Sequence, residues 1–219
     1  IDNVKRLRNH PSIVLWCGNN EVQDAWFRWG WQGRQSDAAR EEISTNYQKI
    51  FLELLPNVLA NLDPDRPYWP SSPAYGDQFG QTSTTQSGDY HYWGVWHGRR
   101  PFESYAEEIP RFSSEYGFQS FPSTKTIESF TLPADRNLES EVMRSHQRHP
   151  IGNQLILDYM ERYYPVPEDF NDFVYMSQVM QGEGIRFGIE ALRRNRPQCM
   201  GSLYWQLNDC WPVASWSGI

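Results

Sequence analysis

The chain has 219 residues, of which 39% are hydrophobic, and it carries a net charge of −7. This length suffices for one or two domains with a substantial buried core. The acidic charge argues against a nucleic-acid-binding surface, which normally carries a basic stripe. The apolar runs are only a handful of residues long, so the sequence predicts no membrane-spanning segment.

Aromatic residues are unusually frequent: they make up 15% of the chain, and ten of them are tryptophans. A buried indole needs a partner for its N–H group, which makes tryptophan costly to place in a core. We therefore expect three or four of the tryptophans in polar loops to form platforms for the C–H faces of sugar rings, and the others to pack. The candidates are Trp26, Trp29, Trp31, Trp93, Trp96, Trp211 and Trp216.

The first elements alternate between helix and strand. Residues 2–8 read as the end of a helix already under way, and the chain opens on Ile1 rather than Met, so we expect it to be part of a larger protein. An apolar strand at 13–17 precedes a polar, Trp-rich loop. A long helix then begins near Ser36 or Asp37, either of which is a good N-cap. It ends by Asp63-Pro64, and its apolar stripe comprises Ile43, Tyr47, Ile50, Phe51, Leu54, Leu55, Val58 and Leu62.

The remaining elements continue the alternation. A short strand at 66–73 leads into a loop at 74–88 that is rich in Gly, Ser, Thr and Gln. Further strands are predicted at 89–93 and 111–117, and an apolar run that ends in polar side chains follows at 200–209. Two helical stretches lie between, at 138–163 with a break at Pro150, and at 170–195.

This pattern predicts an α/β protein with a parallel sheet and right-handed crossovers. Apolar strands that end in polar clusters are typical of a (β/α)8 TIM barrel, but a complete barrel needs roughly 250 residues. We count five strands, and therefore expect only the later part of a barrel, the fourth to the eighth strands with their helices. The whole range 1–219 is then a partial catalytic barrel domain of a larger multidomain protein.

Two carboxylates stand at the ends of predicted strands. Glu21 closes the first apolar run, and Glu115 closes the strand at 111–117. Parallel barrels carry their chemistry at the carboxyl ends of the strands. Two carboxylates that face each other across a sugar can hydrolyse a glycoside: one protonates the leaving oxygen while the other attacks the anomeric carbon.

Three motifs carry a resemblance to a known family. The segments HPSIVLWCGNNE at 10–21, FSSEYGFQS at 112–120 and GSLYWQLNDCWP at 201–212 closely resemble family 2 glycoside hydrolases, and among them the β-mannosidases most. The resemblance extends over nearly the whole chain and keeps the order of the motifs. A single Asn-Glu or Ser-Glu-Tyr-Gly usually marks a solvated turn, but three such motifs in family order make that interpretation improbable.

The resemblance implies a retaining exo-glycosidase that releases terminal non-reducing β-D-mannose by double displacement. Glu21 would be the general acid/base at the end of the fourth strand, and Glu115 the nucleophile at the end of the seventh. Asn20 would bind the sugar 2-hydroxyl. The strand at 89–93 would be the sixth, and Leu203–Leu207 the eighth, with Trp205 as the floor of the subsite for the cleaved sugar.

Other polar and aromatic residues lie near the predicted strand ends. We expect His91 and Trp93 to contact the ligand, with packing or support of the contacting residues as the alternative. His146 and His149 lie on a predicted helix and read as surface residues. No cluster has transition-metal spacing and no Gly-rich phosphate loop is present, so the sequence predicts no metal and no cofactor.

The expected partner is an oligosaccharide substrate, together with N-terminal barrel strands and accessory β-domains of the parent chain. The chain alone is therefore expected to be inactive. The alternatives within the family are β-galactosidase, exo-β-glucosaminidase and endo-β-mannosidase activities; Glu21 weighs against the glucosaminidases, which tend to carry Asp at that position. A non-catalytic carbohydrate-binding scaffold is the alternative from another class. The compartment of the parent protein stays open among periplasmic, extracellular and lysosomal.

Overall fold

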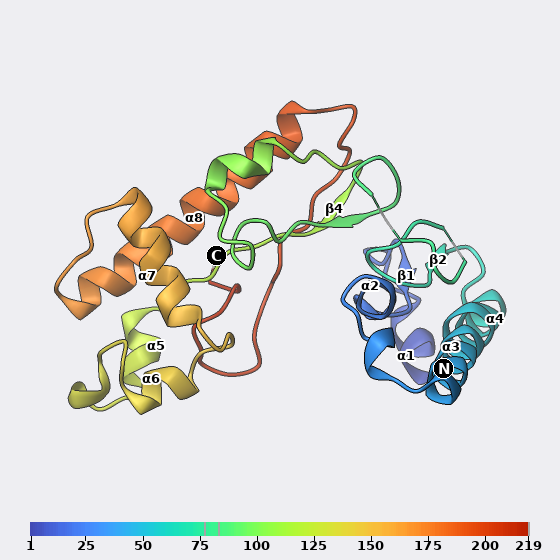
Figure 1. Ribbon diagram of the computed structural model, residues 1–219, viewed down its shortest axis with the longest axis horizontal. Helices are drawn as coiled ribbons and strands as arrows, with labels where there is room; N and C mark the ends of the chain where they lie inside the picture. Colours follow the sequence, from blue (N-terminus) through green and yellow to red (C-terminus); the bar gives the residue numbers. More distant parts are fainter. Residues whose placement is uncertain (77, 83, 219) are drawn as a thin grey trace. The chain divides into compact units, whose positions relative to one another are not determined.

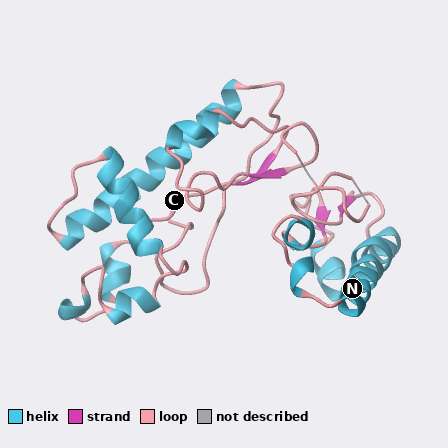
Figure 2. Cartoon of the chain, in the orientation of Figure 1, coloured by secondary structure: helices cyan, strands magenta, loops and turns pink. Residues whose placement is uncertain are grey.

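The computed structural model describes residues 1–76, 78–82 and 84–218. The chain forms two compact units. The first comprises Ile1–His91 and Pro110–Ser114, and the second comprises Tyr92–Ile109 and Glu115–Ile219. Figure 2 shows that helices make up most of the regular structure and that the strands are short.

The helices of the first unit agree with most of the predicted elements (Figure 1). They are α1 (Asp2–Leu7), α2 (Val22–Phe27), the 3₁₀ helix η1 (Gln32–Arg34), α3 (Asp37–Gln48), the π-helix η2 (Lys49–Leu54) and α4 (Leu55–Leu62). The long predicted helix is therefore confirmed, as a continuous α3–η2–α4 run. Ser36 is its N-cap, since its side chain accepts a hydrogen bond from the backbone N–H of Ala39.

The π-helical segment of this run has an identifiable cause. Pro56 lies two residues after its end, near the start of α4. Proline lacks an N–H group, and its ring collides with the carbonyl four residues earlier, here that of Leu52. Widening the turn at η2 relieves that collision. Only part of the predicted apolar stripe is buried: Tyr47 is buried, whereas Ile43, Ile50 and Leu54 are exposed.

The first two strands pair in parallel, as predicted, but are shorter than predicted. β1 (Trp16–Cys17) pairs with β2 (Tyr68–Trp69), with Trp16 opposite Tyr68. The backbone N–H of Trp16 donates to Pro67 O over 3.0 Å, and that of Gly18 to Trp69 O over 2.8 Å. Residues 13–15, predicted as part of the strand, lie outside this ladder, and Val14 is 75% exposed.

The third and fourth strands form a second pair. β3 (Tyr90–His91) is hydrogen-bonded to β4 (Ser113–Glu115). The N–H of Tyr90 donates to Phe112 O over 2.9 Å, and the N–H of Tyr92 donates to Glu115 O over 2.8 Å. The bonds advance in the same direction along both strands, which is the parallel arrangement that the sequence predicts.

The second unit contains the larger core. Its helices are η3 (Phe102–Ala106), α5 (Thr124–Glu128), η4 (Pro133–Asp135), α6 (Glu141–Ser145), α7 (Gly152–Tyr163) and α8 (Phe170–Arg194). The predicted stretches 138–163 and 170–195 are thus confirmed, including the break near Pro150. The fully buried large side chains are mostly from this unit and include Trp96, Tyr116, Phe118, Phe121, Ile127, Met143, Leu155, Ile156, Tyr159, Met160 and Met180.

Two glycines of α8 allow close approach by aromatic rings. A Cβ atom at Gly184 would lie 2.6 Å from Cε1 of Phe102, and one at Gly188 would lie 2.8 Å from Cε2 of Tyr116. Neither distance is sterically possible without a shift of the ring. Gly188 therefore lets α8 pack directly on Tyr116, the residue after Glu115.

Two predictions about local structure are wrong. Residues 22–27, predicted as a loop, form α2, which is too short for a periodic signal and buries Gln23, Asp24, Ala25 and Trp26. Leu203–Leu207, predicted as a strand, forms none in the part of the chain that the structure describes. A strand needs a partner with free N–H and C=O groups; here Trp205 N–H donates to Tyr116 O and Gln206 N–H to Trp216 O, without a continuing ladder.

The predicted barrel is therefore not closed among the described residues: their strands form two parallel pairs and no continuous sheet. The loop predicted at 74–88 contains neither helix nor strand in its described part, and its residues 77 and 83 lie outside the described residues. Within the same described ranges, every helix is too short or too polar to cross a lipid bilayer.

The cap of α3 gives a stability prediction. Replacing Ser36 by Ala removes the acceptor for Ala39 N–H, so we expect Ser36→Ala to lower the free energy of unfolding by about 1 kcal/mol. Urea denaturation followed by circular dichroism measures this. Ser44→Ala, in the body of the same helix, is the matched control and should cause no loss, because alanine has the higher helix propensity. Equal losses in both variants would rule out the cap as the cause.

Candidate active site

Glu21 lies at a strained position where the β1 segment turns into α2. It is the N-cap of α2 and has a φ of 62°, in the left-handed region. For a non-glycine residue this conformation costs on the order of 1 kcal/mol or more and persists only where the surroundings enforce it. Here the N–H of Glu21 donates to Ser72 O over 2.7 Å, and the carbonyl of Glu21 accepts from Ala25 N–H over 2.8 Å.

Asn19 is the side chain that holds this turn. Its Nδ2 donates to Pro70 O over 2.8 Å, and its Oδ1 accepts from Ser71 Oγ over 2.8 Å and from the N–H of Val22 over 3.2 Å. The amide thereby ties the β1 end, the β2 end and the first turn of α2 together. The neighbouring Asn20 forms a parallel backbone bridge with Ser72 and is exposed.

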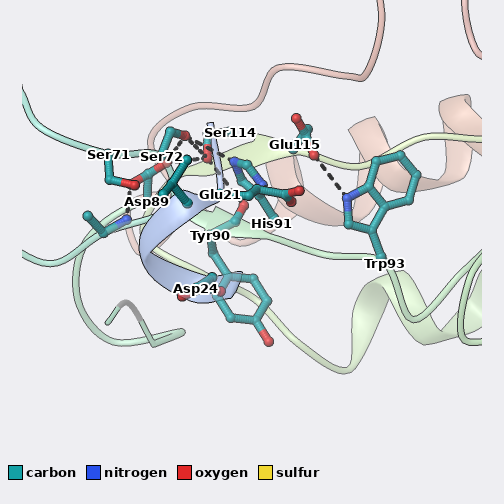
Figure 3. A network of polar contacts seen from close by, with 12 residues as sticks. Glu21, Asp24, Ser71, Ser72, Asp89, Tyr90, His91, Trp93, Ser114 and Glu115 are labelled. Atoms are coloured by element: carbon teal, nitrogen blue, oxygen red, sulfur yellow. Dashed lines mark hydrogen bonds and ion pairs between the residues drawn. The ribbon is translucent and has the colours of Figure 1, made fainter. Parts of the chain in front are cut away.

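The carboxylate of Glu21 is hydrogen-bonded to His91 on β3. The distance from His91 Nδ1 to Glu21 Oε1 is 2.7 Å, and the side chains are 5% and 21% exposed, respectively (Figure 3). The other ring nitrogen, Nε2, lies 3.0 Å from Ser72 Oγ. His91 therefore links Glu21 to the end of β2.

Ser72 in turn contacts Asp89, which is a hub of hydrogen bonds. Asp89 Oδ2 accepts from Ser72 Oγ and from Ser114 Oγ, each over 2.5 Å. Asp89 Oδ1 accepts from Trp69 Nε1 over 3.1 Å and from the N–H of Ala74 over 2.9 Å. Figure 3 shows Ser72, Asp89 and Ser114 gathered beside Glu21 and His91.

In the second unit, Glu115 is a buried acid at the end of β4, with 6% of its surface exposed. Its Oε2 accepts a hydrogen bond from the indole Nε1 of Trp93 over 2.9 Å (Figure 3). A donor aimed at the carboxylate suits a nucleophile that must be ionised.

Gly117 allows Trp205 and Trp93 to approach the strand that carries Glu115. A Cβ atom at Gly117 would lie 2.3 Å from Trp205 O and 3.2 Å from Cη2 of Trp93. The N–H of Trp205 donates to Tyr116 O over 2.8 Å, and the side chain of Trp205 remains 36% exposed. The Trp205–Gln206 peptide is cis.

Of the sequence-predicted site residues, the first unit brings Glu21 and His91 into contact, with Asn20 next to Glu21. The second unit brings Trp93 into contact with Glu115. It also places Trp205 on the backbone of Tyr116.

Sequence reasoning missed Ser72, Asp89 and Ser114. The available signals were that Ser72 and Asp89 stand at ends of predicted strands and that Ser114 directly precedes Glu115.

The tryptophans divide between core and surface. Trp26 and Trp96 are buried and pack, whereas Trp29, Trp31 and Trp211 are exposed. Trp93 and Trp216 are intermediate and lie edge to face, with ring centroids 6.1 Å apart.

The interpretation of His146 and His149 as surface residues is wrong, because both are half-buried against aromatic rings. His146 stacks on Phe130 with a centroid distance of 3.8 Å, and His149 packs against Trp96 at 5.8 Å. Burial lowers the pKa of His149.

Asp24 lies on α2, one turn after Glu21, and is only 7% exposed. Its Oδ2 is 3.3 Å from Arg28 Nη1, while its buried Oδ1 has no hydrogen-bond partner. Burial is the main cause that raises the pKa of Asp24, and the Arg28 charge opposes it. The ionised carboxylate is therefore a destabilising group at this position.

This gives a prediction about pH. A raised folded-state pKa means that the unfolded chain loses the Asp24 proton first, near its ordinary value of about 3.9, so stability from this group declines as pH rises through the folded-state pKa. Asn cannot ionise. We therefore expect Asp24→Asn to gain stability relative to the wild type between pH 4 and pH 7, as measured by melting temperatures at both pH values. A constant difference would contradict the assignment.

Comparison with known proteins finds similar proteins that match nearly the whole length of this chain. No protein-family model matches it. It is 37% identical to β-mannosidase B of Aspergillus niger, covering 99% of this chain and 26% of the relative, and 37% identical to β-mannosidase B of Thermothelomyces thermophilus, covering 99% and 27%. A crystal structure of β-D-mannosidase from Dictyoglomus thermophilum matches with a TM-score of 0.81 and 42% identity, covering 98% of this chain and 25% of that chain.

The chain thus spans about a quarter of the length of the relatives it matches. Two kinds of comparison, by sequence and by structure, agree over nearly every residue of it. The resemblance that the three motifs predicted is therefore confirmed: over nearly its whole length, the chain is similar to part of β-mannosidases.

Proposed function

We propose that this chain supplies both catalytic carboxylates of a retaining exo-β-mannosidase, with Glu21 as the general acid/base and Glu115 as the nucleophile. The observation that carries the proposal is that each acid follows or ends a short strand and has a hydrogen-bond partner at its carboxylate. Glu21 Oε1 lies 2.7 Å from Nδ1 of His91, and Glu115 Oε2 accepts from Nε1 of Trp93 over 2.9 Å. The names of the relatives support β-mannoside as the substrate class.

In the first step, Glu115 attacks the anomeric carbon while Glu21 protonates the glycosidic oxygen. The bond from C1 to that oxygen breaks, the alcohol leaves, and a mannosyl ester of Glu115 forms. Trp93 donates to Oε2 of Glu115 and so stabilises the ionised nucleophile before the attack.

In the second step, Glu21 takes a proton from water, and the resulting oxygen attacks C1 from the face that the leaving group vacated. The ester bond breaks and Glu115 is released as a carboxylate. Two inversions restore the β configuration. Retention of this kind requires the two carboxyl groups to be about 5–5.5 Å apart across the sugar.

The remaining predicted residues would bind the mannose. The exposed Asn20 would hydrogen-bond the 2-hydroxyl, in a contact that strengthens as the oxocarbenium-like transition state forms. Trp205, which keeps 36% of its surface exposed, would floor the subsite. In the parent barrel, β1 to β4 would be the fourth to seventh strands, and 1–219 a part of the catalytic domain.

The substrate assignment is tested with nitrophenyl glycosides. The full-length protein that contains this chain should hydrolyse 4-nitrophenyl β-mannoside with a kcat/KM at least about tenfold above that for the β-galactoside or the β-glucosaminide. A difference of this size corresponds to 1.4 kcal/mol of differential transition-state binding. Hydrolysis of the galactoside alone would overturn the assignment to mannose.

The roles of the two acids predict distinct variants of the same protein. Glu115→Gln removes the nucleophile and should lower turnover of every glycoside by about a thousandfold or more. Glu21→Ala should spare the glycosylation step for aryl glycosides with good leaving groups. Azide should then restore turnover by attacking the mannosyl ester in place of water, which gives the β-azide. Glu103→Gln, on η3, is the matched control and should retain activity. Rescue that yields the α-azide would mean that the roles are reversed.

A further inference from the structure

One hydroxyl group lies between Asp89 and the histidine that contacts Glu21. Ser72 Oγ is 2.5 Å from Asp89 Oδ2 and 3.0 Å from His91 Nε2. A serine hydroxyl has a single hydrogen, so it donates to one of these neighbours and only accepts from the other. The direction chosen by Ser72 therefore determines whether Nε2 of His91 carries a hydrogen.

Asp89 determines the direction in which the Ser72 hydroxyl donates, because both carboxylate oxygens of Asp89 accept hydrogen bonds. Oδ1 accepts from two N–H groups, those of the Trp69 indole and the Ala74 backbone. Neither of these groups can accept a hydrogen in return. Oδ2 faces the hydroxyls of Ser72 and Ser114, both at 2.5 Å, the short distance typical of a hydroxyl that donates to a carboxylate.

Ser72 therefore donates to Asp89 and presents only lone pairs to His91. The second hydroxyl near Ser72, Ser114 Oγ, is 3.5 Å away, so it is a poorer acceptor for the Ser72 hydrogen than Asp89 Oδ2 at 2.5 Å. Nε2 of His91 must then be the donor across the 3.0 Å contact. The side chain of His91 is only 5% exposed, so water competes little for these bonds.

This has a consequence at the other ring nitrogen. With a hydrogen on Nε2, a neutral His91 has a lone pair on Nδ1, and the hydrogen in the 2.7 Å contact comes from Glu21; if Nδ1 also carries a hydrogen, His91 is an imidazolium. In both cases Glu21 and His91 share one hydrogen in addition to the one on Nε2. In the reverse tautomer the ring hydrogen on Nδ1 donates to Glu21 across this contact, so Glu21 is an unprotonated acceptor with no proton of its own to give.

We propose that Asp89 and Ser72 are positioning residues that keep a hydrogen on Nε2 of His91, so that Glu21 and Nδ1 of His91 hold the transferable proton that the general acid needs. The proposal rests on the proposed function only for the role of that proton. The tautomer of His91 is measurable without any substrate.

Asp89→Asn is the decisive variant. The amide oxygen can keep the Trp69 and Ala74 hydrogen bonds, while the NH₂ group replaces Oδ2 and offers one N–H to Ser72 and one to Ser114. Ser72 is then an acceptor toward residue 89, and its hydrogen turns to Nε2 of His91. The variant is nearly isosteric and should reverse the tautomer to hydrogen on Nδ1.

The tautomer is read from ¹⁵N chemical shifts and one-bond couplings of the ring nitrogens in the chain labelled at histidine, with the His91 signals identified by their loss in His91→Gln. We expect Nε2 protonated in the wild type and unprotonated in Asp89→Asn. Asp63→Asn is the matched control, because Asp63 also accepts an indole N–H, from Trp16 over 2.7 Å, but has no contact with Ser72 or His91. It should leave the His91 signals unchanged.

An unprotonated Nε2 in the wild type overturns the proposal, whether or not any variant folds. Ser72→Ala provides a second variant, in which Nε2 loses its acceptor and the preference for hydrogen on Nε2 should weaken. If Asp89→Asn leaves Nε2 protonated, Asp89 does not govern the tautomer and the proposal fails.

Activity of the full-length protein tests the role of the proton. Methyl β-mannoside needs protonation of its leaving oxygen, whereas 2,4-dinitrophenyl β-mannoside does not. Asp89→Asn should lower kcat/KM for the methyl glycoside about 10- to 100-fold more than for the dinitrophenyl glycoside. Equal losses would overturn the positioning role. A wild type that hydrolyses neither substrate would overturn the proposed function, while a protonated Nε2 would still support the tautomer assignment.

Discussion

The left-handed backbone at Glu21 is the constraint on which the first unit depends. It turns the chain from β1 into α2 within one residue and directs the carboxylate toward His91. An isolated peptide would not hold a glutamate in this conformation. The turn persists because Asn19 and the backbone of Ser72 satisfy the polar groups on both sides of it. The backbone strain at Glu21 is thus offset by hydrogen bonds that Asn19 and Glu21 form with residues 70–72, about fifty positions along the chain.

The second unit places its acid by close packing instead. Gly188 lets α8 lie against Tyr116, and Gly117 lets the Trp205 backbone and the Trp93 ring approach the same strand. Glu115 directly precedes Tyr116 and Gly117. Its position therefore depends on close contacts that any side chain at Gly117 or Gly188 would prevent. The indole of Trp93 then serves two purposes, since it packs at its ring and donates at its nitrogen.

Much of the helical structure was predictable because its signals are local. Ser36 caps α3 through a bond to a residue three positions away, and Pro150 breaks the helical stretch at 138–163 whatever packs against it. Strand lengths were not predictable in this way. Val14 and Leu203 have strand-forming neighbours in sequence, but only residues that meet a partner's N–H and C=O groups become strand.

The sequence by itself determined the resemblance to β-mannosidases, the order of the three motifs and the two acidic residues that define the candidate site. It also determined the bounds of the long α3–η2–α4 run and of α8 to within about one residue. Only the tertiary structure decided which polar groups meet: Ser72, Asp89 and Ser114 come from three separate segments, and their hydrogen bonds exist only in the register that the strand pairs adopt. The physical reason is that caps and helical stripes act over a few residues, whereas a hydrogen-bond network depends on donors and acceptors whose separation along the chain carries no information about their distance in space.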